Sequence, residues 1–183
     1  MSVLDNQPSS HNFFNPANHR LVIKRCPNIV WFTQKVSLPD IVSPTPFENN
    51  PFAPIPHAGD RIDFAPLSFQ FVVQEDLGDY LEIFRWMEAL GHPEAFDQYR
   101  ELQTAGRVAP MESTGLKSEI SVMLLDSAQR PIMDFVFHHA FPYELSGFQL
   151  DTTDDQVSTA TATAKFRYVN FEVNPVVRAN CDV

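Results

Sequence analysis

The side chains that most often carry chemistry in proteins are scattered in this sequence. The six histidines include one adjacent pair, His138 and His139, in a stretch expected to form a strand. Neighbouring residues of a strand point to opposite faces, so this pair is not expected to bind one metal ion. The two cysteines, Cys26 and Cys181, lack the spacing of a metal or redox motif. Packing and surface roles are the expectation for all of them, and a Cys26–Cys181 disulfide stays open.

The motifs of nucleotide-binding and hydrolytic enzymes are also missing. The sequence has no G-x-S-x-G, no phosphate-binding loop and no G-x-G-x-x-G, and it contains only 6 glycines. Carboxylates gather at 75–79 and 151–155, and a glycosidase would use such a pair of acids. Helix capping and turn formation are simpler roles for them. Trp31 and Trp86 would suit a ligand pocket, although core or interface packing is commoner. We therefore expect no enzyme, no metal and no cofactor.

Composition predicts one acidic domain. A chain of 183 residues that is 44% hydrophobic suits a single core. The net charge of -10 and pI near 4.9 argue against a nucleic-acid grip, which needs clustered Lys and Arg. The 16 phenylalanines and 15 prolines favour strands joined by extended connections. The sequence shows neither a membrane-spanning apolar run nor a signal-peptide pattern, so we expect a soluble protein made in a cytoplasm.

The stretch from Leu67 to Leu90 organises the rest of the chain. Leu67 to Val73 alternates apolar and polar residues, which predicts a half-buried strand. Asp76 stands at the expected N-cap of a helix that Gly91 ends. The apolar stripe predicted to pack this helix on a sheet consists of Leu77, Tyr80, Leu81, Phe84, Met87 and Leu90. If that stripe is buried, Phe84→Ala costs about 3–5 kcal/mol of stability.

The other periodic segments are mostly strands. The predicted strands are His19–Cys26, Asn28–Val36, Ile62–Phe64, Lys117–Asp126, Pro131–Phe141 and 159–173, the last with a bulge near Tyr168 and Val169. A second helix is predicted over 93–103, a loop over 104–116 and irregular chain over 141–150. We therefore expect a mainly β (α+β) fold, an antiparallel β-barrel or sandwich with one flanking α-helix. Residues 1–18 are expected to form an arm, 19–173 the domain and 174–183 a tail.

Two segments carry apolar side chains without a regular face to bury them. Six prolines between Pro39 and Pro56 exclude a helix or a central strand there. So long a connection in a compact domain is usually functional or in contact with a partner. The candidate inter-subunit contacts in this segment and the N-terminal arm are Phe13, Phe14, Phe47, Phe52 and Ile55.

Four phrases of the sequence resemble the tail-tube family of contractile-tailed bacteriophages, which shares its fold with type VI secretion tube proteins. They are VSLPDI (36–41), GDRIDFAPLSFQFVVQEDLGDYLEIFRWM (59–87), SVMLLDSAQRPIMDFVFHHAFP (121–142) and VSTATATAKFRYVNFEV (157–173). The resemblance spans residues 20 to 173 and includes no catalytic signature.

The resemblance implies a structural role in a virion tail, assembled in the host cytoplasm without a membrane. Six subunits would join their strands into one barrel around a channel, and the rings would stack inside a sheath, with baseplate or neck proteins at the ends. Ring closure also removes the unpaired strand edges that endanger a monomer. By this analogy DNA passes through the lumen without specific binding, because like charge suppresses phosphate contacts.

The proline-rich segment and the polar ends depart from the commonest tube subunits. They suit contacts between rings or with the sheath, and equally a relative at one end of the tube, such as a baseplate tube initiator or tail-completion protein. The alternative from another class is a ligand-binding β-sandwich module with its ligand beside Trp31.

Overall fold

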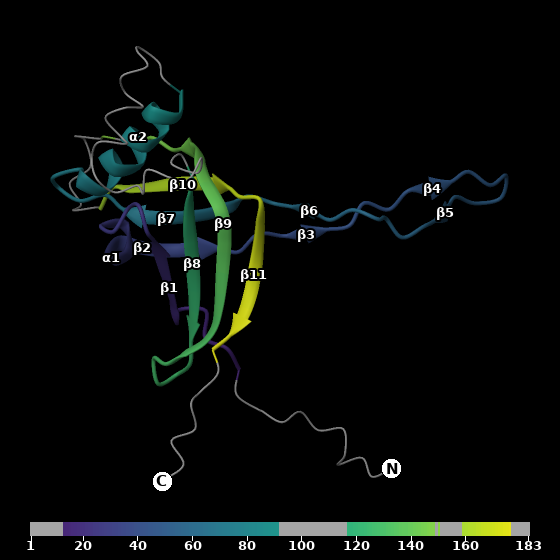
Figure 1. Cartoon of the computed structure of the whole chain (residues 1–183), viewed down its shortest axis with the longest axis horizontal. Helices are drawn as coiled ribbons and strands as arrows, with labels where there is room; N and C mark the ends of the chain where they lie inside the picture. The colour runs from purple at the N-terminus through teal and green to yellow at the C-terminus, as the bar shows by residue number, and fades with distance from the viewer. Residues whose placement is uncertain (1–12, 92–116, 149, 151–158, 177–183) are drawn as a thin grey trace, which may run out of the picture.

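The computed structural model describes residues 13–91, 117–148, 150 and 159–176 (Figure 1). In chain order its elements are β1 (His19–Ile23), α1 (Ile29–Phe32), β2 (Thr33–Ser37), β3 (Ile41–Val42), β4 (Phe47–Glu48), β5 (Ile55–Pro56), β6 (Asp63–Phe64), β7 (Leu67–Val72), α2 (Gly78–Gly91), β8 (Ser118–Leu125), β9 (Pro131–Leu145), β10 (Thr161–Arg167) and β11 (Asn170–Pro175). No helix in these ranges is long and apolar enough to cross a membrane. The predicted second helix, the loop over 104–116, the acidic turn and Cys181 lie outside the described residues.

Seven of the strands form one antiparallel sheet that changes direction at β9, and the other four form two separate two-stranded pairs. The order of the large sheet is β1-β8-β9-β10-β7-β2, with β11 paired to β9. Residues 133–138 of β9 pair with β11, whereas residues 141–145 pair with β10. We call β1, β8, the first part of β9 and β11 the first sheet, and the last part of β9, β10, β7 and β2 the second sheet. Figure 1 shows the two sheets crossing each other. The expected antiparallel β architecture is confirmed, in the form of a sandwich-like packing instead of a closed barrel.

The corner between the two sheets explains an error in the expected final strand. The segment predicted as one bulged strand is two strands, β10 and β11, which separate at Tyr168 and Val169. Each pairs with a different part of β9, whose backbone turns at His139 with a φ of 55°. The amide of Val169 donates to the His138 carbonyl at 3.1 Å across the corner. The shift of apolar phase in the sequence therefore marks a change of sheet. The register shift in this region lies instead between Lys165 and Phe166.

The core lies between the two sheets and beneath α2. β7 alternates as predicted, with Leu67, Phe69 and Phe71 buried. Phe69 stacks on Phe166 at a ring separation of 5.4 Å. The buried cluster comprises Leu21, Ile23, Cys26, Ile29, Leu67, Phe69, Phe71, Ile83, Trp86, Ile120, Val122, Phe137, Ala140, Ala162, Ala164 and Phe166.

The buried face of α2 differs from the predicted stripe. Ile83, Trp86 and Ala89 face the core, and the Trp86 ring contacts Phe166 at 5.6 Å. Of the predicted set, Tyr80, Met87 and Leu90 are half-buried against the core, while Leu77, Leu81 and Phe84 are exposed. Phe84 is 48% exposed, so the expected cost of Phe84→Ala is wrong for the single chain. The helix carries apolar residues on two adjoining stripes, and the stripe that contains the larger Trp86 side chain is buried.

Side chains of two aspartates hold the turn between β7 and α2. The amide of Gly78 donates to Asp76 Oδ1 at 3.1 Å. Asp76 was predicted to be the N-cap, but because α2 begins at Gly78, Asp76 lies one residue before the N-cap. Leu77 has a φ of 55°, and its carbonyl accepts from the Leu81 amide at 2.9 Å. Asp79 is fully buried, and its Oδ1 accepts from the Tyr80 amide at 2.8 Å. Both carboxylates thus act on backbone N–H groups that the helix start leaves unpaired.

Other boundaries shift where tertiary pairing decides them. The segment predicted as a strand from Asn28 to Val36 begins with the short helix α1, and only Thr33–Ser37 is a strand. β9 continues through Leu145 into chain expected to be irregular, because β10 is available to pair with it. β11 includes Asn174 and Pro175, which had been expected in the tail.

Candidate functional site: surfaces for assembly

The proline-rich segment forms a long hairpin that projects from the body. We call residues 38–66 the arm. Its ladder consists of two short pairs, β3 with β6 and β4 with β5, and Figure 1 shows it extending from the ends of β2 and β7, past β11. Prolines limit each pair to a few residues because they donate no ladder hydrogen bond. The arm is thus a two-stranded ribbon that lacks a core of its own.

Specific contacts fix the shape of the arm. The His57 amide donates to the Pro46 carbonyl at 2.9 Å, and the His57 ring lies 3.0 Å from Glu48 Oε2. At Gly59 the two strands approach so closely that a Cβ atom would lie 1.9 Å from the Pro44 carbonyl oxygen. Arg61 pairs with Asp63 at 3.0 Å. The His57 contacts join the two strands of the ribbon, and the apolar side chains Phe47, Phe52 and Ile55 are exposed.

An aromatic cluster anchors the root of the arm to the body. The Phe64 ring lies 5.4 Å from Phe171 and 6.1 Å from Tyr168. The Tyr168 hydroxyl donates to the Ala65 carbonyl at 2.8 Å, and burial raises the pKa of Tyr168 to about 12. Phe137 contacts both Tyr168 and Phe171 from β9. The direction of the arm is therefore set by packing at the corner between the sheets.

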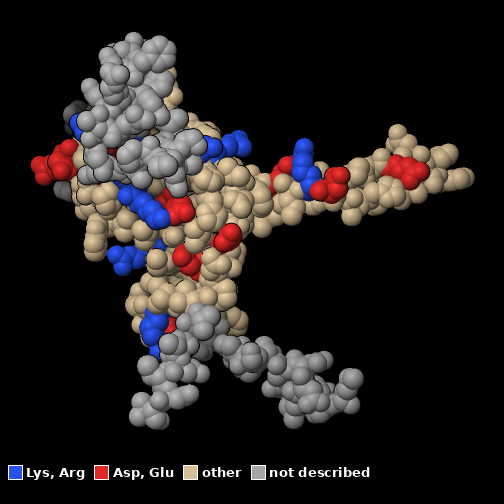
Figure 2. Space-filling view, viewed as in Figure 1, with Lys and Arg blue, Asp and Glu red and all other residues tan. Residues whose placement is uncertain are grey.

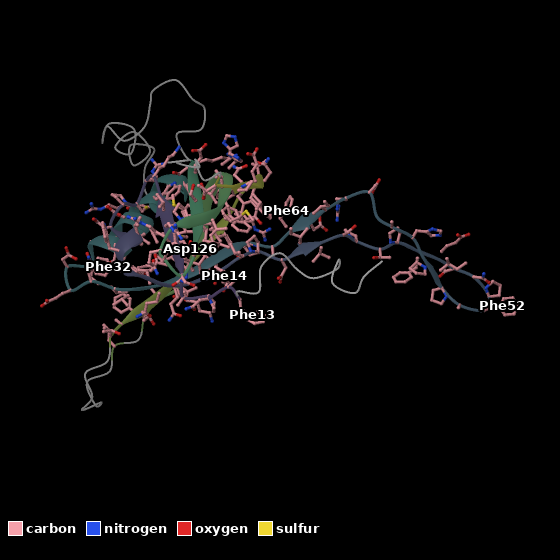
Figure 3. The ribbon with its side chains drawn as sticks, turned by 90° about the horizontal axis from the view of Figure 1, so that it is seen from below. Phe13, Phe14, Phe32, Phe52, Phe64 and Asp126 are labelled. Carbon is pink, nitrogen blue, oxygen red and sulfur yellow. The ribbon has the colours of Figure 1, made fainter. Side chains whose placement is uncertain are left out.

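All five candidate inter-subunit residues are exposed in the single chain. Phe52 is 96% exposed at the tip of the arm, and Phe13 is 97% exposed near the β8–β9 turn (Figure 3). Asn18 ties this N-terminal segment to that turn, since its carbonyl accepts from the Leu125 amide at 3.0 Å. The five residues occupy two separate regions: Phe47, Phe52 and Ile55 on the arm, and Phe13 and Phe14 on the N-terminal segment.

The sheet offers hydrogen-bonding edges to another chain. In the described ranges β1 pairs only with β8, β11 only with β9, and β2 only with β7. The outer edges of β1 and β11 are the two borders of the first sheet, and neither border has a neighbouring strand among the residues that the structure describes. Such borders are templates for pairing with another strand.

An exposed tryptophan lies near the β1 border. Trp31, on α1 between β1 and β2, is 76% exposed, and the Arg20 guanidinium lies over its ring at 5.6 Å. Trp and Arg are enriched among the residues that dominate interface energies. The sequence gives Trp31 no partner on its own element. Its exposure follows from the break between β1 and β2 that α1 fills.

The described side chains do not assemble a metal site. Within those residues, no three His, Cys, Asp or Glu side chains are grouped to hold a metal ion. Cys26 is buried, and Cys181 lies outside the described ranges, so their pairing stays open. The features described so far are edges, an arm and exposed aromatic rings, which are the parts of an assembly surface.

Comparison with solved structures identifies the fold. No protein-family model and no curated protein matches the chain. A chain of the anti-feeding prophage cap, the tube-terminating cap, matches with a TM-score of 0.58 and 12% identity over 96% of this chain and 100% of that chain. A chain of the extended sheath–tube complex of the extracellular contractile injection system PVC matches with a TM-score of 0.56 and 12% identity, over 96% of this chain and 99% of that chain. A chain of the anti-feeding prophage baseplate matches with a TM-score of 0.52 and 14% identity, over 85% of this chain and 90% of that chain.

These similarities establish a tail-tube-like fold of the kind found in contractile injection systems. At 12–14% identity they concern the fold, and the role of this chain has to be argued from its own surfaces. The sequence phrases that resemble tail tubes are thus confirmed at the level of fold. Sequence reasoning missed the two borders of the first sheet, because the order of strands in space cannot be read from the chain.

Proposed function

We propose that this protein is a structural tube subunit that closes into six-membered rings, which stack into the tube of a contractile tail. The observation that carries the proposal is a first sheet whose two borders have no partner strand within the described part of the chain. The fold is shared, over nearly the whole chain, with a chain of a sheath–tube complex. A ring gives every such border a partner, which a monomer cannot do.

The strand directions permit this closure. Successive strands of the first sheet, β1, β8, β9 and β11, are all antiparallel. β1 and β11 therefore run in opposite directions at the two borders. When identical subunits are arranged around an axis, β11 of one copy meets β1 of the next in antiparallel orientation. The junction continues the ladder already present in each subunit, and a ring of copies forms one continuous barrel.

The packing inside each subunit decides which face lines the channel. Leu21, Ile120 and Phe137 lie on the face of the first sheet that the second sheet and α2 already cover. The opposite face is thus the one that would surround the hole. It carries basic side chains near β1 and acidic ones toward β11 (Figure 2), without a basic stripe to hold a phosphate backbone. This mixed lining suits cargo that passes without specific binding, and we propose DNA as that cargo.

The arm would contact the neighbouring copy that joins at β11. Its root touches β11 through Phe64 and Phe171, and it projects beyond that border (Figure 1). A copy docked at β11 would lie beneath or beside it, where Phe47, Phe52 and Ile55 gain an apolar partner. Sheath and baseplate or neck proteins would bind the remaining outer surfaces of the tube, in a virion tail assembled in the host cytoplasm.

The experiment is to measure mass and shape together. Light scattering of the purified full chain is expected to give a hexamer, and negative-stain microscopy is expected to show rings with a central hole that stack into tubes. Single unstacked rings would favour the end-of-tube alternative, a tube initiator or completion protein. A monomer at every concentration would exclude the tube proposal and leave the ligand-binding module.

A variant without the arm tests how the copies hold together. Residues 43–62 are replaced by Asn-Gly, because Val42 pairs directly with Asp63 and a two-residue turn fits that register. We expect the thermal stability of the dissociated subunit to change little, since all of the removed residues except Pro44 and Gly59 are exposed, while rings and tubes become weaker. Unchanged assembly would remove the arm from the interface and leave the edge-pairing proposal intact.

A further inference from the structure

A row of charged side chains crosses the first sheet on the face away from the core. Lys24, just after β1, pairs with Glu119 on β8. Glu119 Oε1 lies 3.7 Å from His138 Nδ1 on β9, and His138 Nε2 lies 3.6 Å from Glu172 Oε1 on β11. The hydrogen bond from Lys24 lowers the pKa of Glu119, which favours the charged form of this carboxylate. The row thus runs from one border of the sheet to the other.

The two ends of this row have opposite charge. Residues 19–37, which include β1, α1 and β2, contain the basic residues Arg20, Lys24, Arg25 and Lys35 and no acidic residue. This segment is basic in a chain whose net charge is -10. At the other border, Glu172 is the charged residue of β11, and its side chain is 59% exposed. A basic border and an acidic border on one sheet are complementary between successive copies.

The register brings these ends together across a subunit junction. Leu21 and Ile23 are buried, so Arg20, Val22 and Lys24 share the opposite face. Across the sheet, Val22 pairs with Ser121, Ser121 with Val136, and Val136 with Glu172. In a junction without stagger Glu172 would therefore face Val22 of the next copy, with Arg20 and Lys24 two residues to either side. A stagger of two residues, which keeps every side chain on its face, places Glu172 directly opposite one of them.

We propose that this row is an electrostatic belt that closes between copies, with Glu172 on β11 of one subunit paired to Arg20 or Lys24 on β1 of the next. The inference rests on the ring proposed above and names the contact that directs it. An exposed ion pair contributes only about 0–1 kcal/mol, but the pair recurs at every junction. It also selects direction: β1 against β1 joins like charges, as does β11 against β11, and only the head-to-tail junction joins opposite ones.

Two charge variants test the belt. Glu172→Lys makes both borders basic, and Arg20→Glu with Lys24→Glu makes both acidic. At low salt each variant alone is expected to need about tenfold more protein than the wild type to form rings, measured by sedimentation velocity. Mixed in equal amounts, the two variants are expected to restore rings of alternating subunits, because every junction in such a ring again joins opposite charges.

Controls separate charge from folding and from the ring itself. Glu75→Lys changes net charge equally in the exposed β7–α2 turn and is expected to assemble like the wild type. Thermal unfolding of each dissociated variant verifies its fold. In about 1 M salt, the protein concentrations at which Glu172→Lys and the wild type form rings should become more similar. The belt would be overturned, while the ring proposal stands, if Glu172→Lys formed rings at the same protein concentration as the wild type. The same conclusion would follow if a mixture of the folded variants did not form rings. A monomeric wild type would overturn both.

Discussion

The body and the arm use the same kinds of side chain in opposite ways. They are built on the same two strands, since β2 and β7 continue into the arm. Within the body β7 lies between β10 and β2, and its side chains Phe69 and Phe71 are buried in the core. Between Ser37 and Leu67 the structure describes no third strand beside the ribbon, and Phe47 and Phe52 are exposed.

The difference follows from the number of layers rather than from composition. A two-stranded hairpin is marginal in water, because it has no second layer on which to bury a face. The body stabilises its own fold with its aromatic rings, so the exposed rings of the arm are available to another molecule. The prolines of the arm also keep its edges from pairing freely with other chains. Stability and assembly should therefore respond to different substitutions.

The largest effect is expected where α2 meets the sheets. Trp86 is 1% exposed and packs against Phe166 and the Arg25 guanidinium. Trp86→Ala should reduce the free energy of unfolding by about 3–5 kcal/mol, because the cavity lies beneath the helix. Phe84→Ala, on the exposed side of the same helix, is the matched control and should cost less than about 1 kcal/mol in the dissociated subunit. If urea unfolding showed that the two variants lose equal free energy of unfolding, the buried face of this helix would be wrongly assigned.

A smaller effect is expected at the root of the arm. Tyr168→Phe keeps the ring and removes the hydrogen bond to the Ala65 carbonyl. The free energy of unfolding should fall by about 0.5–1.5 kcal/mol near neutral pH. The measurement is denaturant unfolding of the dissociated wild type and variant side by side.

The same residue gives a pH dependence with a defined sign. Burial raises the pKa of Tyr168 to about 12, whereas a tyrosine in the unfolded chain has a pKa of about 10. The unfolded chain therefore loses this proton first, and the stability it contributes is present below about pH 10 and lost between about pH 10 and 12. Over that range the wild type should lose its advantage over Tyr168→Phe. A gap between the two proteins that stays constant to pH 12 would contradict the burial of this hydroxyl.

The smallest effect on stability is expected at the tip of the arm. Phe52 is exposed, so Phe52→Ala should change the free energy of unfolding of the dissociated subunit by less than about 0.5 kcal/mol. Its effect should appear in assembly, as fewer rings at a given protein concentration by sedimentation. His57→Ala, which removes a polar contact from the same ribbon, provides a comparison within the arm. A Phe52 variant that is destabilised yet assembles normally would reverse the division between body and arm.

Local patterns were sufficient for some elements and ambiguous for others. The alternation in β7 predicts the observed strand, and β8 and β9 lie where strands were predicted at Lys117–Asp126 and Pro131–Phe141. The face of α2 was wrongly predicted because Ile83 and Trp86 form a stripe beside that of Leu81 and Phe84. Periodicity gives both stripes similar weight, and only the volume available beneath the helix distinguishes them.

The candidate site divides in the same way. The exposure of Phe47 and Phe52 follows from proline spacing, which denies the segment a central position in a sheet. The borders at β1 and β11 do not follow from any local pattern. Their positions depend on β9 serving two sheets, through a turn at His139 between two stretches of otherwise similar strand.

By itself the sequence determined an antiparallel β protein with one amphipathic helix and a proline-stiffened segment that cannot form a central strand of a sheet. It did so because side-chain alternation and proline chemistry act within a few residues. Tertiary structure alone decided which face of α2 is buried, where the chain changes sheet, and that Lys24 and Glu172 lie at opposite borders of one row. Those outcomes depend on contacts between residues far apart in the chain, where the order of strands and the fit of side chains in a common core select one arrangement.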